Sequence, residues 1–198
     1  MRAPIHDLHA SNALTYLSLA SGIGAVAASR AGGRVGLAPA LLALAALADT
    51  FDGRFARRFT RSPRQARVGA ETDNLVDAVV FGMVPVAAVG SLVPPPAGWL
   101  GLAWWVAAFL YALAVVVRLG FFAAEADHDR FIGMPTPAAA LIWSTTLMAT
   151  PSATVCTAVF FASAVAMVWP VAIPRPRGPG LAVFALWAVG LVAWHLSR

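Results

Sequence analysis

The chain has 198 residues, of which 60% are apolar and 12% charged, and its mean hydropathy is +0.75. Soluble domains are about 45–50% apolar and about 25% charged, so an ordinary soluble enzyme, a disordered chain and a collagen-like fibre are excluded. The net charge is +5 and all fourteen basic residues are arginines that lie between apolar stretches. We therefore expect one membrane domain over residues 1–198, with the lipid bilayer and its anionic headgroups as partner and no nucleic acid.

Apolar stretches that approach the roughly 20 residues of a spanning helix recur along the whole chain. They predict an all-α, polytopic transmembrane helix bundle with six or seven spans, at 12–29, 36–53, 72–92, 98–122, 136–150, 152–171 and 180–196. The fifth stretch is short, and Pro151 separates it from the sixth, which leaves the two counts open. Residues 1–11 could form a short helix that lies on the membrane interface.

The arginines predict the orientation of the bundle. If the N-terminus is cytoplasmic, eleven arginines lie on the inner side, six of them between Arg54 and Arg67, and three lie outside. Because cytoplasmic loops of membrane proteins carry an excess of arginine and lysine, we expect an inner or plasma membrane protein with this basic loop in the cytoplasm.

Acidic residues gather at the two edges of the basic loop, at helical spacing. Residues three or four apart share one face of a helix. The stripe that ends the second span consists of Asp49, Asp52, Gly53 and Ala56, and the stripe that opens the third consists of Gly69, Asp73 and Asp77. Two helices joined by one loop can turn these stripes toward each other, which would bring four carboxylates together at one end of the bundle.

Four converging carboxylates would repel one another unless cations lay among them. Magnesium prefers oxygen ligands and commonly combines carboxylates with substrate phosphates, so this pattern predicts a Mg²⁺ or Mn²⁺ site for a phosphorylated amphiphile. Gly53, Ala56 and Gly69 would leave room beside the carboxylates for a base and a diphosphate, and Arg57 could pair with phosphate. Any one of these acids alone could be a solvated helix cap.

Other polar residues are weaker candidates. Asn12 could contact a nucleotide or cap a helix, and Arg118 could bind an anionic substrate or extend to the membrane interface. For the others we expect structural or solvated positions. Glu125, Asp127, His128 and Asp129 would lie in a solvated loop, His195 at the membrane interface and Cys156 in the core. The seven tryptophans would form aromatic belts, and Ser144, Thr145 and Thr146 would bond between helices.

The acidic stripes resemble a known signature. Asp-x-x-Asp-Gly-x-x-Ala-Arg at 49–57, followed by Gly-x-x-x-Asp-x-x-x-Asp at 69–77, is similar to the motif of the CDP-alcohol phosphatidyltransferases. The segments 80–85 and 131–140 and the opening Asn-Ala-Leu-Thr at 12–15 resemble the phosphatidylserine synthase branch. The connection between the two halves of the signature is longer and more basic than is usual. The phosphatidylserine synthase branch also tends to carry a second arginine shortly after the position of Arg118, and residues 119–122 contain none.

The resemblance implies the chemistry. The donor would be CDP-diacylglycerol, and Asp49, Asp52 and Asp73 would bind the metal, with Asp77 either shared with the metal or acting as catalytic base. Gly53, Ala56, Arg57, Gly69, Asn12 and Arg118 would bind substrate, and the chain would form a homodimer. The acceptor would be a small polar alcohol, most readily L-serine, and the products phosphatidylserine and CMP.

Two alternatives stay open from the residues. Inositol phosphate, glycerol phosphate or choline could replace serine as the acceptor in the same reaction. A divalent-cation transporter would also use converging acids, but it would need them near the middle of the bilayer, whereas these lie at one end of their predicted helices.

Overall fold

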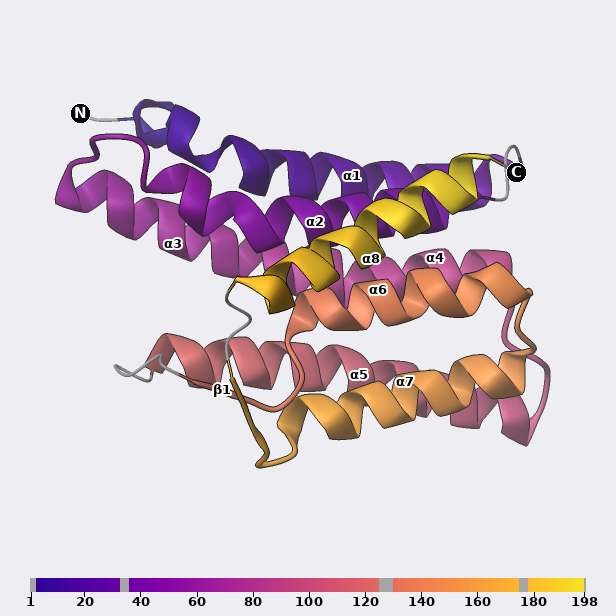
Figure 1. Cartoon of the computed structure of the whole chain (residues 1–198). Helices are drawn as coiled ribbons and strands as arrows, with labels where there is room; N and C mark the ends of the chain where they lie inside the picture. The colour runs from indigo at the N-terminus through magenta and orange to yellow at the C-terminus, as the bar shows by residue number, and fades with distance from the viewer. Residues whose placement is uncertain (1–2, 33–35, 125–129, 175–177, 198) are drawn as a thin grey trace.

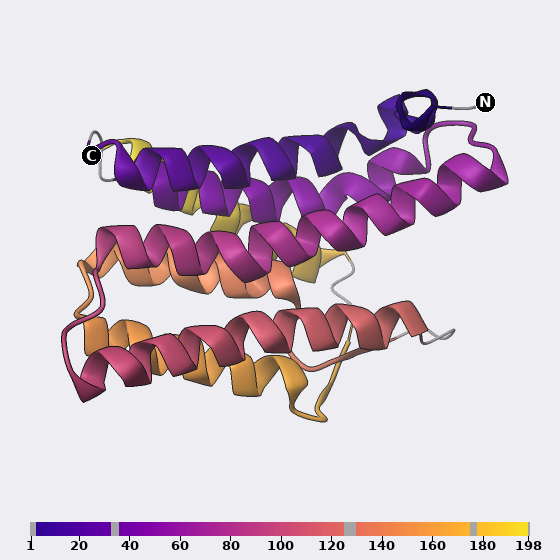
Figure 2. The ribbon, with the colours of Figure 1, turned by 180° about the vertical axis from the view of Figure 1, so that it is seen from behind.

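The computed structural model describes residues 3–32, 36–124, 130–174 and 178–197, and it is an all-α bundle, as predicted. Its helices run roughly parallel or antiparallel to one another (Figures 1 and 2). They are α1 (Ala13–Arg30), α2 (Leu37–Ala56), α3 (Pro63–Asp77), α4 (Val84–Leu92), α5 (Trp99–Ala124), α6 (Thr136–Thr146), α7 (Ala153–Val168) and α8 (Pro179–Leu196).

Within the described residues, three helices are long and apolar enough to cross a membrane: Pro63–Leu92, Trp99–Ala124 and Pro179–Leu196. The helix Ala153–Val168 is apolar but shorter. The stretches predicted at 12–29 and 36–53 form α1 and α2, where serines and the charged residues near the end of α2 reduce the hydropathy. Large apolar side chains such as Trp99, Phe109 and Leu186 are exposed on the outside of the bundle, as lipid-facing residues would be.

The predicted basic loop is mostly helical, which corrects the predicted start of the third span at residue 72. Residues 54–56 end α2, and α3 begins at Pro63, so only residues 57–62 connect the two helices. Ser62 and Gln65 form a capping box, and Pro63 occupies the first turn. Both features stabilise a helix N-terminus.

A small sheet was not predicted. Strands β1 (Arg130–Ile132) and β2 (Ala172–Pro174) pair antiparallel and join the segments before α6 and after α7. The fifth predicted span begins at Thr136, as predicted, but its α-helix ends at Thr146 and a 3-10 turn, Leu147–Ala149, follows. At the N-terminus, the expected interfacial helix is two 3-10 turns, Pro4–Asp7 and Ala10–Asn12.

The core is built on small residues of α2 and large residues of α5, α6 and α7. Alanines of α2, among them Ala43 and Ala46, are fully buried and allow neighbouring helices to approach closely. Trp104, Trp143 and Phe160 pack ring against ring in the core. The prediction of aromatic belts is therefore wrong for these two tryptophans. Cys156 is buried, as predicted.

Two of the three hydroxyl residues that were predicted to bond between helices do so. Ser144 donates to the Pro39 carbonyl at 2.9 Å, as predicted, and Thr145 accepts from Trp187 Nε1 at 3.1 Å. The hydroxyl of Thr146 instead bonds within its own helix, to Ile142. His195 does not lie at the interface: it is 6% exposed, and its Nε2 lies 2.9 Å from the Ser144 carbonyl oxygen.

Candidate functional site

Three of the four aspartates converge at one end of the bundle. Asp49 and Asp52 lie in the last two turns of α2, and Asp73 lies in α3. One carboxylate oxygen of each lies within 4.8 Å of the others. Asp77, one turn after Asp73, contacts the carboxyl group of Asp49. The two stripes therefore face each other, as the helical spacing predicted.

Thr15 of α1 completes this cluster, and the sequence analysis gave it no role. Its hydroxyl lies 3.3 Å from an oxygen of Asp52 and 3.4 Å from one of Asp73, and the residue is buried. A hydroxyl can donate one hydrogen bond, so it can bond either carboxylate and holds the ends of α1, α2 and α3 together. In the sequence, only the position of Thr15 at the end of the Asn-Ala-Leu-Thr segment, residues 12–15, could have indicated a role for it.

Two cavities meet at the acids. The smaller, of about 220 Å³, lies between the start of α1 and the facing ends of α2 and α3. It is lined by Ser11, Asn12, Thr15, Asp52, Gly53, Ala56, Arg57, Arg61, Ala66, Gly69, Ala70 and Asp73. Gly53, Ala56 and Gly69 were expected to leave space beside the acids, and all three line this cavity.

Asn12 lies deep in the smaller cavity. It is 4% exposed, and among the described residues its Nδ2 has no hydrogen-bond partner. It precedes α1 without making a side-chain cap bond, so the capping alternative is wrong. A Cβ atom on Gly69 would lie 2.9 Å from Asn12 Oδ1, so any larger residue there would displace the Asn12 amide. Buried donors of this kind normally bind a partner, and here the cavity supplies room for one.

The larger cavity, of about 630 Å³, extends from the acids in another direction. Asp49 and Asp77 line it together with Arg118 of α5, Thr136 at the start of α6 and apolar residues of α8 such as Phe184. Asp52, Gly53, Arg57 and Asp73 line both cavities. A substrate bound across the acids could therefore extend into both spaces.

Arg118 is buried rather than extended to the membrane surface. It is 7% exposed, and its guanidinium carbon lies 4.5 Å from the centre of the Phe122 ring. Its position in the larger cavity beside Asp77 excludes simple extension to the interface. Arg57 is exposed at the rim. The acidic cluster around Asp127 lies outside the described residues.

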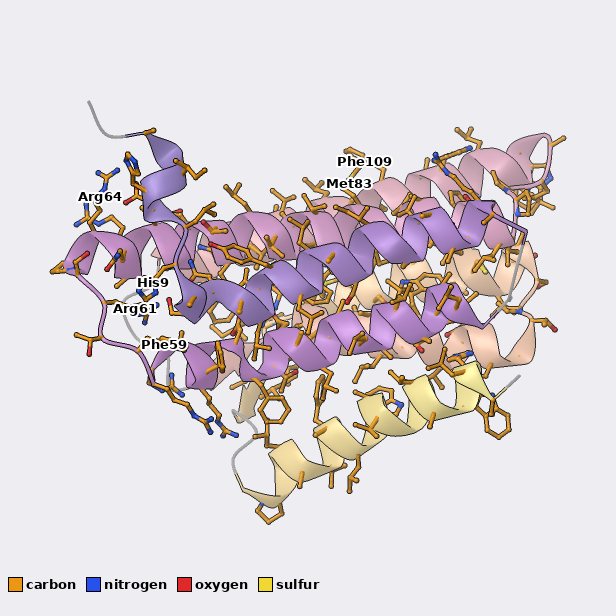
Figure 3. All side chains as sticks on the ribbon, turned by 90° about the horizontal axis from the view of Figure 1, so that it is seen from above. His9, Phe59, Arg61, Arg64, Met83 and Phe109 are labelled. Carbon is orange, nitrogen blue, oxygen red and sulfur yellow. The ribbon has the colours of Figure 1, made fainter. Side chains whose placement is uncertain are left out.

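The N-terminal segment contacts the residues that follow α2 and those that begin α3. Asp7 accepts two hydrogen bonds from the Arg64 guanidinium, at 3.1 and 2.7 Å. The His9 ring meets Phe59 edge to face, 6.0 Å between centres. Figure 3 shows His9, Phe59, Arg61 and Arg64 gathered at this end of the bundle. The basic connection between α2 and α3 therefore packs against the N-terminal segment.

The acidic residues fit a divalent cation. Three carboxylate oxygens from two helices lie within 4.8 Å of one another, and hard cations such as Mg²⁺ take oxygen ligands of this kind. Without a cation, the negative charges would repel one another at close range. Asp49, Asp52 and Asp73 are therefore the residues that could hold the ion.

Comparisons with known proteins agree with this geometry. The sequence model of the family described as CDP-alcohol phosphatidyltransferase matches residues 8–175. The CDP-diacylglycerol–serine O-phosphatidyltransferase of Mycobacterium tuberculosis (strain ATCC 25618 / H37Rv) is 39% identical over 140 residues, which are 66% of this chain and 46% of that protein.

The similarly named protein of Mycobacterium leprae (strain TN) is 39% identical over 112 residues, 52% of this chain and 34% of that protein. The chain thus spans less than half the length of these curated relatives. Since the family match covers both acidic stripes and every residue that lines the smaller cavity, the chain belongs to the CDP-alcohol phosphatidyltransferase family.

Proposed function

We propose that this membrane protein transfers a phosphatidyl group from CDP-diacylglycerol to the hydroxyl of L-serine, giving phosphatidylserine and CMP. The observation that carries the proposal is the convergence of Asp49, Asp52 and Asp73 where two cavities meet. A donor with a nucleotide, a diphosphate and a lipid tail needs such an arrangement, because its reacting phosphate must lie between two differently shaped spaces.

The smaller cavity would hold the nucleotide. Asn12 Nδ2 is a buried donor without a partner among the described residues, and it would bond to the cytidine. Gly53, Ala56 and Gly69 leave the cavity open, and Arg57 at its rim would pair with a phosphate oxygen. In the larger cavity, apolar residues of α8 such as Leu181 and Phe184 would accompany the lipid tail toward the bilayer.

Asp77 would act as the catalytic base. One of its carboxylate oxygens is buried and accepts no hydrogen bond from the described residues, so it is available for the proton of the serine hydroxyl. The hydroxyl oxygen would bond to the phosphorus next to diacylglycerol as the bond to the CMP oxygen breaks. Asp49, Asp52 and Asp73 would hold Mg²⁺ or Mn²⁺, which when bound neutralises charge on the phosphoryl oxygens.

Serine is the acceptor that the similarities favour. The mycobacterial relatives carry this acceptor in their names, and Arg118 offers a buried cation for the serine carboxylate in the cavity that contains Asp77. Inositol phosphate, glycerol phosphate and choline are the competing acceptors. Choline carries no negative charge, so Arg118 favours it least.

The active site would face the cytoplasm. The arginines of 54–67 lie at the same end of the bundle as the acids, while Arg30 ends α1 at the opposite end. Since arginine-rich segments stay on the inner side, this distribution supports a multi-pass protein with its acids inside. The same one-ended position argues against a cation transporter. The homodimer stays a prediction, which light scattering in detergent can check.

The test is an acceptor panel with identified products. Purified protein in mixed micelles would receive CDP-diacylglycerol and magnesium with isotope-labelled serine, inositol phosphate, glycerol phosphate or choline, and product lipids would be identified by mass spectrometry. We expect label in phosphatidylserine alone. Label in another phospholipid would show that its alcohol, and not serine, is the acceptor. Label in no phospholipid would contradict the proposed reaction.

A further inference from the structure

The helix that carries Asp73 and Asp77 changes its form immediately after Asp77. Residues Ala78–Met83 form a π-helical turn, in which the Val84 N–H bonds to the Val79 carbonyl, before α4 continues to Leu92. Such wide turns inside α-helices are rare and frequently accompany functional sites. The π-helical turn therefore needs a cause in the sequence.

Pro85 supplies the cause. In an α-helix, the N–H of residue 85 would donate to the carbonyl of Phe81, but proline has no N–H, and its ring crowds that carbonyl. Widening of the turn relieves the contact and leaves the Phe81 carbonyl in need of another donor. A buried carbonyl without a donor would be costly.

Tyr111 of α5 is that donor. Its hydroxyl donates to the Phe81 carbonyl at 2.7 Å, and the side chain is fully buried. Its ring packs against the rings of Trp143 and Phe160, 6.4 and 5.3 Å away between centres. These neighbours fix the ring, so the hydroxyl defines where the Phe81 carbonyl can lie.

The bond joins the two helices that carry Asp77 and Arg118. Phe81 follows Asp77 by four residues, and Arg118 follows Tyr111 by seven, so each pair lies along one face of its helix. The two helices lie side by side at Gly82, where a Cβ atom would be in ordinary contact with Val115 Cγ1 at 3.4 Å. Beyond this contact, Asp77 and Arg118 line the same cavity.

We propose that Tyr111 is a positioning residue, which through its bond to the π-helical turn sets Asp77 opposite Arg118. The inference rests on the proposed function, in which Asp77 receives the serine proton and Arg118 binds the serine carboxylate. Tyr111 itself touches neither the cavities nor the acids. Its loss would leave substrate binding largely intact but misplace the base relative to the hydroxyl that it must deprotonate.

The experiment compares Tyr111→Phe with Ser144→Ala in the full chain. Ser144 is the matched control, because its fully buried hydroxyl also donates to a backbone carbonyl, that of Pro39, at 2.9 Å. Neither Ser144 nor Pro39 lines the two cavities of the site. We expect both variants to lose comparable thermal stability. Only Tyr111→Phe should lower kcat, by about tenfold, because a displacement of a catalytic group near 1 Å can lower the rate about a hundredfold. The KM values for CDP-diacylglycerol and for serine should stay within about twofold of wild type.

Pro85→Ala provides a second variant that does not remove the hydroxyl. It gives Phe81 a backbone donor and allows the turn to close into an α-helix. We expect thermal stability to be kept or raised while kcat falls. A loss of stability without a fall in kcat would contradict the role of the π-helical turn.

The outcomes separate the two proposals. An inactive wild-type protein would overturn the proposed function, and the role of Tyr111 with it. An active wild type with equal kcat in Tyr111→Phe and Ser144→Ala would overturn only the positioning role. A change in KM without a change in kcat would likewise show that Tyr111 serves binding and not the alignment of Asp77.

Discussion

Replacing Gly69 with alanine tests whether the smaller cavity binds the donor nucleotide. The added Cβ atom would lie 2.9 Å from Asn12 Oδ1 and 3.3 Å from Asn12 Nδ2, where ordinary contacts begin at 3.4 Å. To restore an ordinary contact, the Asn12 amide would have to move by about 0.5 Å. It cannot move outward easily, because Asn12 is buried and its Oδ1 accepts a hydrogen bond from Ser11 at 3.1 Å.

We expect Gly69→Ala to raise the KM for CDP-diacylglycerol about tenfold, equivalent to about 1.4 kcal/mol. Stability should change little, because the helix propensity of alanine, better by up to about 1 kcal/mol, offsets the crowding. The matched control is Gly120→Ala in α5, where a Cβ atom meets nothing within 4 Å. Steady-state CMP release measures both variants. An unchanged KM in Gly69→Ala would refute the placement of the nucleotide beside Asn12.

Three further predictions concern the acids and the core. Thr15→Val removes the hydroxyl shared by Asp52 and Asp73 and should lower kcat/KM roughly fivefold, about 1 kcal/mol, whereas Thr15→Ser should retain activity; equal rates in both would contradict the role of the hydroxyl. Chelation of divalent ions should abolish CMP release, and Mg²⁺ or Mn²⁺ should restore it; activity that survives chelation would exclude the metal. His195→Leu leaves the Ser144 carbonyl without its partner, so thermal unfolding should show a loss of about 1–3 kcal/mol with kcat unchanged, and a normal melting temperature would contradict this.

The bundle and its acidic stripes were predictable because both depend on local periodicity. Long apolar stretches interrupted by proline and glycine give the helices, and spacings of three and four residues place Asp49 with Asp52 and Asp73 with Asp77 on common faces. The connection between them was harder to predict. Its arginines suggested a cytoplasmic loop, yet the capping box at Ser62 begins α3 nine residues before the predicted apolar span.

Residues that act through tertiary contacts were not predictable from spacing. Thr15 reaches Asp52 and Asp73 across 37 and 58 residues, and Tyr111 reaches Phe81 across 30. Hydroxyl-bearing residues in apolar helices usually bond within their own helix or to a neighbour, and the sequence does not say which. His195 was placed at the interface for the same reason, because its partner lies 51 residues away.

Phosphatidyl transfer to serine is tested most directly by CMP release. The purified protein receives CDP-diacylglycerol and magnesium, with or without serine. We predict release that requires both magnesium and serine and that Asp77→Asn lowers by about a hundredfold or more, within the usual contribution of a general base. Equal release by wild type and Asp77→Asn would contradict the role of Asp77. No release by wild type, although CDP-diacylglycerol binds and the whole acceptor panel is present, would contradict phosphatidyl transfer.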